Sequence, residues 1–538
     1  MLEALEHLAF SGVDLNRLLM NQAPQALVLP VVLTNGLSWK TLNPEDAVTL
    51  FDGVTQTPQV ALDIRLTYDE QKNLIISFDY ALAVLETELI REMLSALHHR
   101  LSQITSSASL AAPLEPCIDL SHYRFNSDES ASHDCDFLAK LAQQLFVRTE
   151  DKTAVICGEQ TLSYAQLGEQ VQRVMWQLKA RGLTTGNVLA ICLPRSVEHI
   201  VISLASALSG IIWVPIDAAS PKERLNYLLE NCHADLVVMD KPCEFGNVIA
   251  FDALIEPVLF ADGVPDVTPL DQLSRLSQSQ QTAYYLYTSG TTGKPKCVVV
   301  NNQATSNVIG QTGQAWHLTS EDVVMSVTPL HHDMSVFDLF ATLSFGATLV
   351  LPAGHEEKDA LQWNRLIERH QVTIWVSVPA ILEMLLSCTQ AGQLHSLRLI
   401  AQGGDYIKPA TIAQLRAGSN PPRLISLGGP TETTIWSIWH ELTADDVSVI
   451  PYGRPLAGNR YFIMDEIQRH VPQGVVGRIF TSGVNLAQGY LEDGELKQTD
   501  FVTVLDEHGH PVRAFRTGDQ GYYRADGNII LLAASMVM

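Results

Sequence analysis

The sequence lacks the cysteine and signal patterns that mark secreted and zinc-stabilised proteins. Its eight cysteines include no pair at C-x-x-C spacing, and no group of Cys and His has the spacing of zinc ligands. This distribution favours free thiols in a reducing cytoplasm. The first residues, MLEALEHLAF, are acidic and amphipathic and do not have the composition of a signal peptide. We therefore expect a cytoplasmic protein.

Positive charge and long apolar runs are also scarce. The chain carries 35 Lys and Arg against 59 Asp and Glu, for a formal net charge of -24. No basic stripe is present that could follow a nucleic-acid backbone. The longest apolar run, residues 200–216, is shorter than the ~20 residues that cross a bilayer. These absences argue against a nucleic-acid partner and against a membrane span.

The texture of the sequence predicts four regions. Residues 1–105 hold short apolar strands and then an amphipathic helix, whereas 106–134 are rich in Ser, Ala, Pro and Asp, as linkers are. Residues 135–440 alternate helices with short, wholly apolar strands, which predicts an α/β fold with a parallel-rich sheet. Residues 441–538 form short alternating strands between glycine turns and predict a small β-rich part.

The stretch YTSGTTGKPK, residues 287–296, has the composition of a phosphate-binding loop. Its glycines let backbone N–H groups approach an anion closely, and its hydroxyls and lysines add further donors. It is not the P-loop G-x-x-x-x-G-K-[ST], because Pro295 follows Gly293 and Lys294 and the preceding glycine is only three residues back. We therefore expect a phosphate loop of another class.

This loop resembles the signature loop of the adenylate-forming superfamily, which includes acyl-CoA synthetases, luciferases and the adenylation domains of nonribosomal peptide synthetases. Further blocks follow in the family's order: LSYAQL, WVPID, GGPTETTIW, GRIFTSGVNLAQGY and FRTGD. The WVPID block, with its later P-x-E-R, is similar to peptide-synthetase adenylation domains, and this makes a stand-alone acyl-CoA ligase the weaker alternative. The resemblance covers residues 135–532. It implies two parallel-rich sheets with helices and a small distorted β-barrel.

The resemblance implies roles for the residues that match its motifs. The loop from Thr288 to Lys296 would close over the β- and γ-phosphates of ATP, and Glu432 would hold Mg²⁺, which prefers carboxylate and phosphate oxygens. Asp519 would accept hydrogen bonds from both ribose hydroxyls. Lys296 and Glu432 are the expected catalytic residues of this part. The expected ATP-binding residues are Thr288, Ser289, Gly290, Thr291, Thr292, Gly293, Lys294, Gly404, Asp405, Gly429, Thr431 and Asp519.

The segment HHDMSVFDLF, residues 331–340, would begin the amino-acid pocket. The resemblance pairs Asp333 with the substrate's α-ammonium group. A metal site at His331, His332 and Asp333 is disfavoured because adjacent residues point in different directions. The expected pocket walls offer no partner for a charged substrate tail, which indicates a small neutral amino acid. These walls are Met334, Phe337, Val376, Ala401, Gly403, Leu427, Ile435 and Trp436.

The beginning of the chain narrows the expected substrate. VVLTNGL (31–37) and TQTPQVALD (55–63) resemble the last motifs of a heterocyclisation domain, a variant of the chloramphenicol-acetyltransferase-like α/β condensation fold. The resemblance implies that Thr34 and Asp63 act in cyclodehydration; a capping Thr and a loop Asp are the structural alternative. Such domains precede adenylation domains for Cys, Ser or Thr. Cysteine is favoured, although Val376 departs from the cysteine type and Gly403 is shared with glycine-type pockets.

The resemblance also implies parts that we expect outside this chain. These are the first half of the cyclisation domain, a C-terminal lid with a catalytic lysine, and a carrier domain bearing phosphopantetheine. The loss of such a lysine's charge would slow the chemistry by ~10²–10³ or more. Two interpretations remain open. The chain is either part of a peptide synthetase that forms aminoacyl-AMP, or a degenerate adenylation domain that binds a ligand or partner modules without efficient catalysis.

Overall fold

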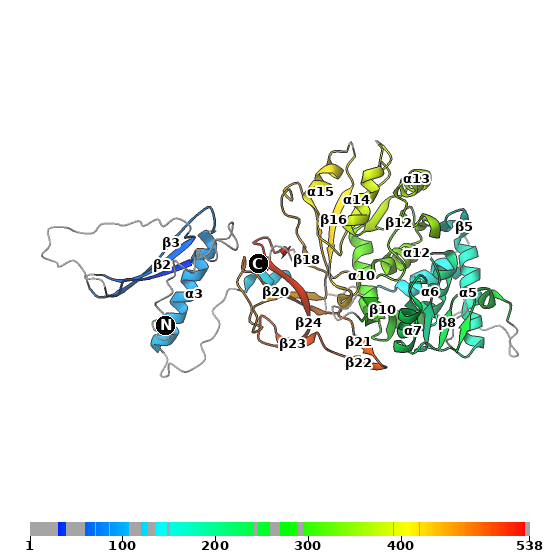
Figure 1. Cartoon of the computed structure of the whole chain (residues 1–538), viewed down its shortest axis with the longest axis horizontal. Coiled ribbons are helices and arrows are strands. Elements are labelled where there is room, and N and C mark those ends of the chain that lie inside the picture. The colour runs from blue at the N-terminus through cyan, green and yellow to red at the C-terminus, as the bar shows by residue number, and fades with distance from the viewer. Residues whose placement is uncertain are drawn as a thin grey trace. The chain divides into compact units, whose positions relative to one another are not determined.

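The computed structural model separates into two compact units, Met1–Asp119 and Leu120–Met538, and we describe each by itself (Figure 1). Among its described residues, no helix is long and apolar enough to cross a membrane. The expected linker at 106–134 is described only in part. The described residues are 31–38, 60–69, 71–85, 87–106, 120–126, 135–147, 151–240, 246–258, 270–288, 294–390, 392–418 and 420–532.

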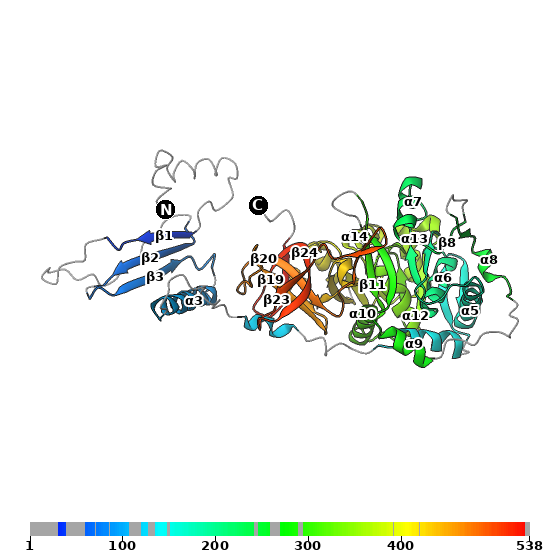
Figure 2. The same cartoon turned by 90° about the horizontal axis from the view of Figure 1, so that it is seen from below.

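The described part of the first unit is a three-stranded sheet with one helix. Strand β1 (Val31–Asn35) pairs in parallel with β2 (Leu62–Tyr68). Strand β2 pairs in the antiparallel sense with β3 (Leu74–Tyr80). Helix α3 (Thr87–Ser106) lies beside this sheet in both views (Figures 1 and 2).

The second unit contains an eight-stranded mixed sheet in the order β22-β21-β11-β10-β7-β6-β8-β9. The strands from β10 to β9 run parallel, and the pairs β10–β11, β11–β21 and β21–β22 are antiparallel. The phosphate loop therefore connects two antiparallel neighbours, β10 and β11. The strands are β6 (Val188–Ile191), β7 (Ile212–Pro215), β8 (Leu236–Val238), β9 (Val248–Ile249), β10 (Thr282–Thr288), β11 (Lys296–Asn301), β21 (Gly489–Glu492) and β22 (Glu495–Lys497).

A nine-stranded sheet in the order β18-β17-β16-β15-β14-β12-β13-β4-β5 forms the other half of the α/β part. Its six central strands, β16 to β4, are parallel, and its edges are antiparallel. The strands are β4 (Thr153–Cys157), β5 (Gln160–Ser163), β12 (Val323–Ser326), β13 (Thr348–Leu351), β14 (Ile374–Ser377), β15 (Leu399–Gln402), β16 (Arg423–Gly428), β17 (Ile438–Glu441) and β18 (Arg454–Pro455).

Helix α7 packs on one face of the eight-stranded sheet, and α13, α14 and α15 pack on one face of the nine-stranded sheet (Figure 1). The other faces of the two sheets share one core with helices that include α5, α6 and α10. Helix α5 begins with a capping box between Ser163 and Gln166. The helices are α4 (Phe137–Ala142), α5 (Tyr164–Ala180), α6 (Val197–Leu208), α7 (Lys222–Asn231), α8 (Asp252–Ile255), α9 (Leu270–Ser277), α10 (Asn302–Ala315), α11 (Met334–Val336), α12 (Thr342–Ser344), α13 (Ala360–His370), α14 (Pro379–Cys388) and α15 (Pro409–Arg416). Short helical turns are η1 (Ser121–Phe125), η3 (Gln143–Val147), η4 (Phe337–Ala341), η5 (Gly354–Glu356) and η6 (Thr431–Thr433).

The β-rich part is an open antiparallel sheet, so the expected small barrel is wrong. The order is β19-β20-β24-β23, with β25 also on β24, and within the described residues β19 and β23 do not pair. The outer edge of β19 is instead covered by side chains of the segment 120–126, because Tyr123 bonds the backbone of Ile463 and Asn126 bonds that of Tyr461. The strands are β19 (Asn459–Met464), β20 (Gly477–Gly483), β23 (Phe501–Leu505), β24 (Pro511–Tyr523) and β25 (Ile529–Leu532).

Candidate active site

A cavity of about 850 Å³ lies in the second unit where strands of all three sheets end or pass. Thr288 comes from the end of β10, Leu427 from β16 and Asp519 from β24. Motifs that are far apart in the sequence therefore meet in one space. The predicted residues that line it are Thr288, Asp333, Met334, Gly403, Gly404, Asp405, Leu427, Gly429, Thr431, Glu432, Ile435, Trp436 and Asp519.

Three predicted pocket residues, Phe337, Val376 and Ala401, do not line this cavity but lie buried in the adjoining core. The alternation of side chains along a strand explains why Val376 and Ala401 lie outside the cavity wall. Val376 and Ala401 are register partners on β14 and β15, and the residues two positions later, Val378 and Gly403, reach the cavity. Phe337 packs its ring 4.7 Å from that of Trp436 and supports the wall from behind.

The phosphate loop is described only at its two ends. Ser289, Gly290, Thr291, Thr292 and Gly293 lie outside the described residues. Lys294 places its ammonium 5.6 Å from the ring of Tyr227, and Lys296 forms an ion pair of 2.8 Å with Asp500. Neither lysine lines the cavity in this arrangement. The first end of the loop nevertheless reaches the site, because Thr288 lines the cavity.

The carboxylate of Asp333 is half-buried and lies at the N-cap of α11. Its Oδ1 accepts a hydrogen bond from the backbone N–H of Met334 at 2.8 Å, and its Oδ2 accepts one from the Thr431 hydroxyl at 2.5 Å. Burial raises the pKa of Asp333, while these hydrogen bonds and the nearby His332 lower it. Such a carboxylate is stabilised by a cation brought into the cavity.

Glu432 lies in η6 and is 8% exposed. Its Oε1 accepts a hydrogen bond from the Tyr490 hydroxyl at 2.6 Å, and its backbone carbonyl accepts one from the N–H of Ala487 at 2.8 Å. Burial raises the pKa of Glu432, and the positive charge of Lys296 opposes that effect. One buried carboxylate that opens on a nucleotide-sized cavity fits Mg²⁺, which binds proteins through one or two carboxylates plus substrate phosphates.

Two tyrosines that the sequence reasoning left without a role belong to the site. Tyr452 lines the cavity, and its hydroxyl accepts a hydrogen bond from the N–H of Gly429 at 2.6 Å. Gly429 has φ +121°, a value that disfavours side chains, so the turn that carries Thr431 and Glu432 needs this glycine. Tyr406, beside Gly404, is 45% exposed on the cavity rim. The sequence contains a signal for each, since PYGRP and QGGDY adjoin the recognised blocks.

Asp519 is the contribution of the β-rich part to the cavity. It follows Thr517 on β24, whose hydroxyl accepts a hydrogen bond from the Asp519 N–H at 3.1 Å. Burial raises the pKa of this carboxyl group. The predicted ribose ligand therefore faces the same cavity as the predicted magnesium ligand.

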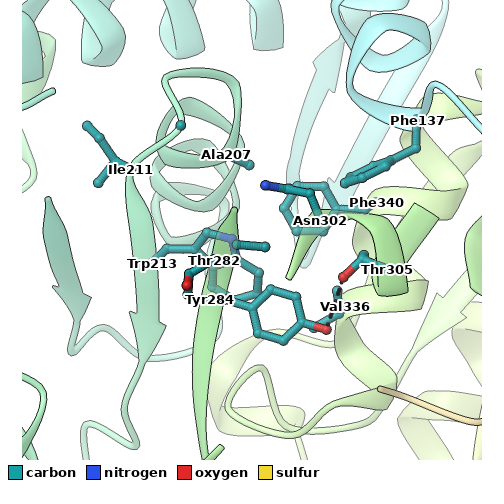
Figure 3. Close-up of a pocket in the computed structure, with 12 residues that line it drawn as sticks. Phe137, Ala207, Ile211, Trp213, Thr282, Tyr284, Asn302, Thr305, Val336 and Phe340 are labelled. Carbon is teal, nitrogen blue, oxygen red and sulfur yellow. Dashed lines mark hydrogen bonds between the residues drawn. The ribbon is translucent and has the colours of Figure 1, made fainter. Parts of the chain in front are cut away.

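A second cavity lies behind β10 and is too small for a nucleotide. It measures about 10 Å³, which is room for one water molecule. Figure 3 shows it between the rings of Trp213, Tyr284 and Phe340, with the amide of Asn302 directed toward it. The hydroxyls of Tyr284 and Thr305 lie 3.5 Å apart at its edge. Of these two cavities, the larger one has room for a nucleotide.

In the first unit, the two predicted cyclisation residues are in direct contact. The hydroxyl of Thr34 on β1 donates to Asp63 Oδ1 on β2 at 2.7 Å. Arg65 lies 3.6 Å from the other oxygen of Asp63 and also contacts Asp79. The beginning of the motif 55–63 lies outside the described residues.

A family model described as AMP-binding enzyme matches residues 142–491. The chain belongs to this family. The matched range contains every predicted residue of the large cavity except Asp519, which lies 28 residues beyond its end, since 519 − 491 = 28. The shared fold is thus the frame of the site described above.

The chain matches parts of longer curated relatives, several of which are named as synthetases or synthases. Pyochelin synthetase PchE of Pseudomonas aeruginosa is 31% identical over 98% of this chain, which spans 36% of that protein. Bacitracin synthase 1 of Bacillus licheniformis is 29% identical over 99%, and phenyloxazoline synthase MbtB of Mycolicibacterium paratuberculosis 29% over 98%. The chain spans 10% and 45% of these two proteins. It therefore covers less than half the length of each.

Solved structures give the same family assignment. The nonribosomal peptide synthetase FmoA3 matches 99% of this chain with 28% identity and a TM-score of 0.84, and the match covers 58% of that chain. Its AMPPNP-bound and alpha-methyl-L-serine-AMP-bound forms match with TM-scores of 0.85 and 0.83. The expected mixed α/β fold of peptide-synthetase adenylation domains is confirmed.

Proposed function

We propose that this chain is the amino-acid-activating part of a nonribosomal peptide synthetase and that its large cavity forms aminoacyl-AMP. The observation that carries the proposal is the convergence of Asp333, Thr431, Glu432 and Asp519 on one cavity. In the reaction, a carboxylate oxygen of the amino acid forms a bond to the α-phosphorus of ATP. The bond from that phosphorus to the bridging oxygen breaks, and pyrophosphate leaves.

Asp333 is the anchor for the substrate's ammonium group. Burial raises the pKa of this half-buried carboxyl group, and the ammonium group of an amino acid would provide the charge that stabilises its ionised form. Thr431 donates to Asp333, so its hydroxyl lies beside the expected ammonium site, where it would also contact the α-phosphate. This arrangement would bring the substrate carboxylate close to the phosphate that it attacks.

The nucleotide would occupy the other end of the cavity. Asp519 would hold the ribose, Gly404 and Asp405 would face the adenine, and the loop from Thr288 to Lys296 would close on the outer phosphates. Mg²⁺ bound at Glu432 would neutralise phosphate charge. The fit of this ion is supported by the oxygen-donor chemistry of the site.

The pocket walls favour cysteine among small neutral amino acids. Met334, Leu427 and Ile435 offer only apolar or thioether surface, and the indole N–H of Trp436 is already bonded to Thr312 at 3.0 Å. A thiol is a weak hydrogen-bond donor, so its burial here costs less than that of a hydroxyl. Serine, threonine and glycine are the alternatives. The structure of FmoA3 with alpha-methyl-L-serine-AMP bound is an example of a similar protein that holds the adenylate of a hydroxy amino acid.

The first unit would use the activated residue after a carrier domain outside this chain accepts it on phosphopantetheine. We propose that Thr34 and Asp63 belong to the end of a heterocyclisation domain and assist ring closure with loss of water. Their direct contact of 2.7 Å supports a shared role. The relative named phenyloxazoline synthase is consistent with such a role.

The test is calorimetric binding of non-hydrolysable aminoacyl-AMP mimics to the full chain. We expect the cysteine mimic to bind most tightly, the serine, threonine and glycine mimics less tightly, and a lysine mimic least. Asp333→Asn should weaken binding by at least ~10-fold, because it leaves the ammonium group without its charge partner. The control is Asp271→Asn, whose carboxylate forms a surface pair with Arg275 on α9. If the folded protein binds none of the mimics, the degenerate adenylation domain is the correct interpretation.

A further inference from the structure

Tyr490 lies between the predicted magnesium carboxylate and the lysine that ends the phosphate loop. It belongs to β21, pairs with Val298 on β11, and is 5% exposed. Its hydroxyl donates to Glu432 Oε1 at 2.6 Å. The ammonium group of Lys296 lies 4.7 Å from the centre of its ring, within range of a cation–π interaction.

The neighbouring charges favour Glu432 as the acceptor of the single phenolic proton. The other carboxylate close to Tyr490 is Asp500. One oxygen of Asp500 forms an ion pair with Lys296 at 2.8 Å, and its other oxygen lies 3.6 Å from the guanidinium of Arg516. Because two cations already offset the charge of Asp500, the phenol is available to Glu432.

The residues around Tyr490 also hold the main chain of Glu432. The N–H of Ala487 donates to the Glu432 carbonyl at 2.8 Å. Ala487 lies three residues before Tyr490, whose hydroxyl bonds the Glu432 side chain. The same short segment therefore fixes both the backbone and one carboxylate oxygen of Glu432. The Tyr490 hydroxyl bonds Oε1, so Oε2 is the carboxylate oxygen of Glu432 that this phenol leaves available.

We propose that Tyr490 is a positioning residue that selects the metal-binding oxygen of Glu432. By donating to Oε1, the phenol holds the carboxylate plane so that Oε2 is presented to Mg²⁺ of the bound nucleotide. The inference rests on the proposed function, in which Glu432 holds that ion. Hydrogen bonds to metal-binding carboxylates orient them, and their loss typically costs ~10–100-fold in metal affinity.

The experiment measures the effect of Mg²⁺ on ATP binding to the full chain by calorimetry. Tyr490→Phe removes the phenol and keeps the ring beside Lys296. We expect the enhancement of ATP affinity by Mg²⁺ to fall ~10–100-fold, with metal-free ATP binding unchanged. A titration with Mn²⁺, followed by the loss of the free-ion EPR signal in protein with ATP and in ATP alone, measures metal binding without turnover; the difference between the two titrations is the contribution of the protein.

Two further variants make the result specific. Tyr164→Phe removes another buried phenol, whose hydroxyl donates to the Ala347 carbonyl at 2.7 Å. Tyr164 does not line the cavity, so this variant should leave the effect of Mg²⁺ intact. Glu432→Gln should abolish that effect.

Three results would overturn the inference in distinguishable ways. If Tyr490→Phe keeps the wild-type effect of Mg²⁺ while Glu432→Gln loses it, the positioning role is wrong and the proposed function stands. If Tyr490→Phe weakens ATP binding equally with and without metal, the phenol has only a structural role. If the wild type binds ATP without any effect of Mg²⁺, the proposed function itself fails at Glu432.

Discussion

At the residue scale, Asp338 is a carboxyl group in an apolar environment just behind the amino-acid pocket. It lies on η4 and is fully buried, and within the described residues neither of its carboxyl oxygens has a hydrogen-bond partner. Burial raises the pKa of Asp338 to about 8, and the neighbouring Ser326 hydroxyl and the positive charge of Arg195 offset only part of that effect. The side chain is therefore neutral in the native protein below about pH 8.

This burial predicts a pH dependence of stability. The pKa of Asp338 is 3.8 without the environment of the fold and about 8 within it. Between these values the native state keeps a proton that the unfolded state has lost, so the free energy of unfolding decreases as pH rises through this window. Asp338→Asn should remove that contribution, which has a limiting slope of ~1.4 kcal/mol per pH unit.

Urea unfolding at pH 5 and pH 7.5 measures this contribution. We expect the wild type to lose more stability than Asp338→Asn between the two pH values, with the surface variant Asp271→Asn behaving as the wild type. Equal losses in the wild type and Asp338→Asn would show that the buried carboxyl group does not keep its proton in the native state.

The positions of individual residues show how much of the site can be predicted from the sequence. Motif residues such as Asp333, Glu432 and Asp519 were predicted from their neighbours in the sequence and do meet at the cavity. Val376 and Ala401 were expected in the wall but lie one pleat away from it. Period-two alternation gives the face of a strand, but the depth at which a cavity opens depends on packing from other elements.

At the element scale, Arg195 connects the segment before α6 to the end of β12. Its guanidinium donates to the backbone carbonyls of Ser326 at 2.6 Å, Thr328 at 2.7 Å and Val327 at 3.0 Å. The side chain is 1% exposed and lies 3.3 Å from Glu357. Because the chain leaves β12 toward Asp333, this arginine holds the strand end from which the amino-acid pocket begins.

Arg195→Lys should therefore loosen that strand end. A lysine carries its donors on one nitrogen and cannot reproduce the planar fork that reaches several carbonyls. Leaving one or more buried carbonyls unbonded should reduce the free energy of unfolding by ~1–3 kcal/mol and weaken binding of the aminoacyl-AMP mimic. Chemical denaturation and calorimetry check the two effects.

Arg173→Lys, at a surface pair with Glu169 on α5, is the matched control and should change neither quantity. Unchanged stability together with unchanged mimic binding in Arg195→Lys would contradict the role assigned to this arginine. The expected alternation of helices with short apolar strands over residues 135–440 agrees with the presence of β12 and α6. No local pattern predicted the arginine between them, since its acceptors lie more than 130 residues away.

At the scale of the whole molecule, composition and motif order predicted an α/β protein with a β-rich part near its end, and both are present. The prediction of a barrel was wrong because a sheet closes only if its two edge strands pair with each other. The alternation of apolar and polar residues along each strand does not determine that pairing. The outer edge of β19 is covered from a distant segment, in which Tyr123 and Asn126 lie more than 330 residues before their partners. That segment falls inside the stretch 106–134, whose composition indicated only a linker.

This covering segment leads to a prediction for two shortened chains, 120–538 and 135–538. The Tyr123 hydroxyl donates to the Ile463 carbonyl and accepts from the Ile463 N–H, both at 3.1 Å. Asn126 makes the equivalent pair with Tyr461 at 3.0 and 2.9 Å. A chain that starts at 135 loses all four bonds and exposes a buried strand edge, which favours aggregation. At ~1 kcal/mol for each bond, it should be ~4 kcal/mol less stable than the chain that starts at 120.

Thermal unfolding and light scattering of the two shortened chains measure the difference. In the intact protein, Tyr123→Phe should give a smaller loss of ~1–3 kcal/mol, because its ring still packs against Phe462 and Tyr523 and the Ile463 carbonyl keeps its bond from the Val471 N–H, while the Ile463 N–H loses its partner. Equal melting temperatures for 120–538 and 135–538 would mean that the β-rich part closes its own edge. In that case 120–126 would be a linker in the thermodynamic sense as well as in composition.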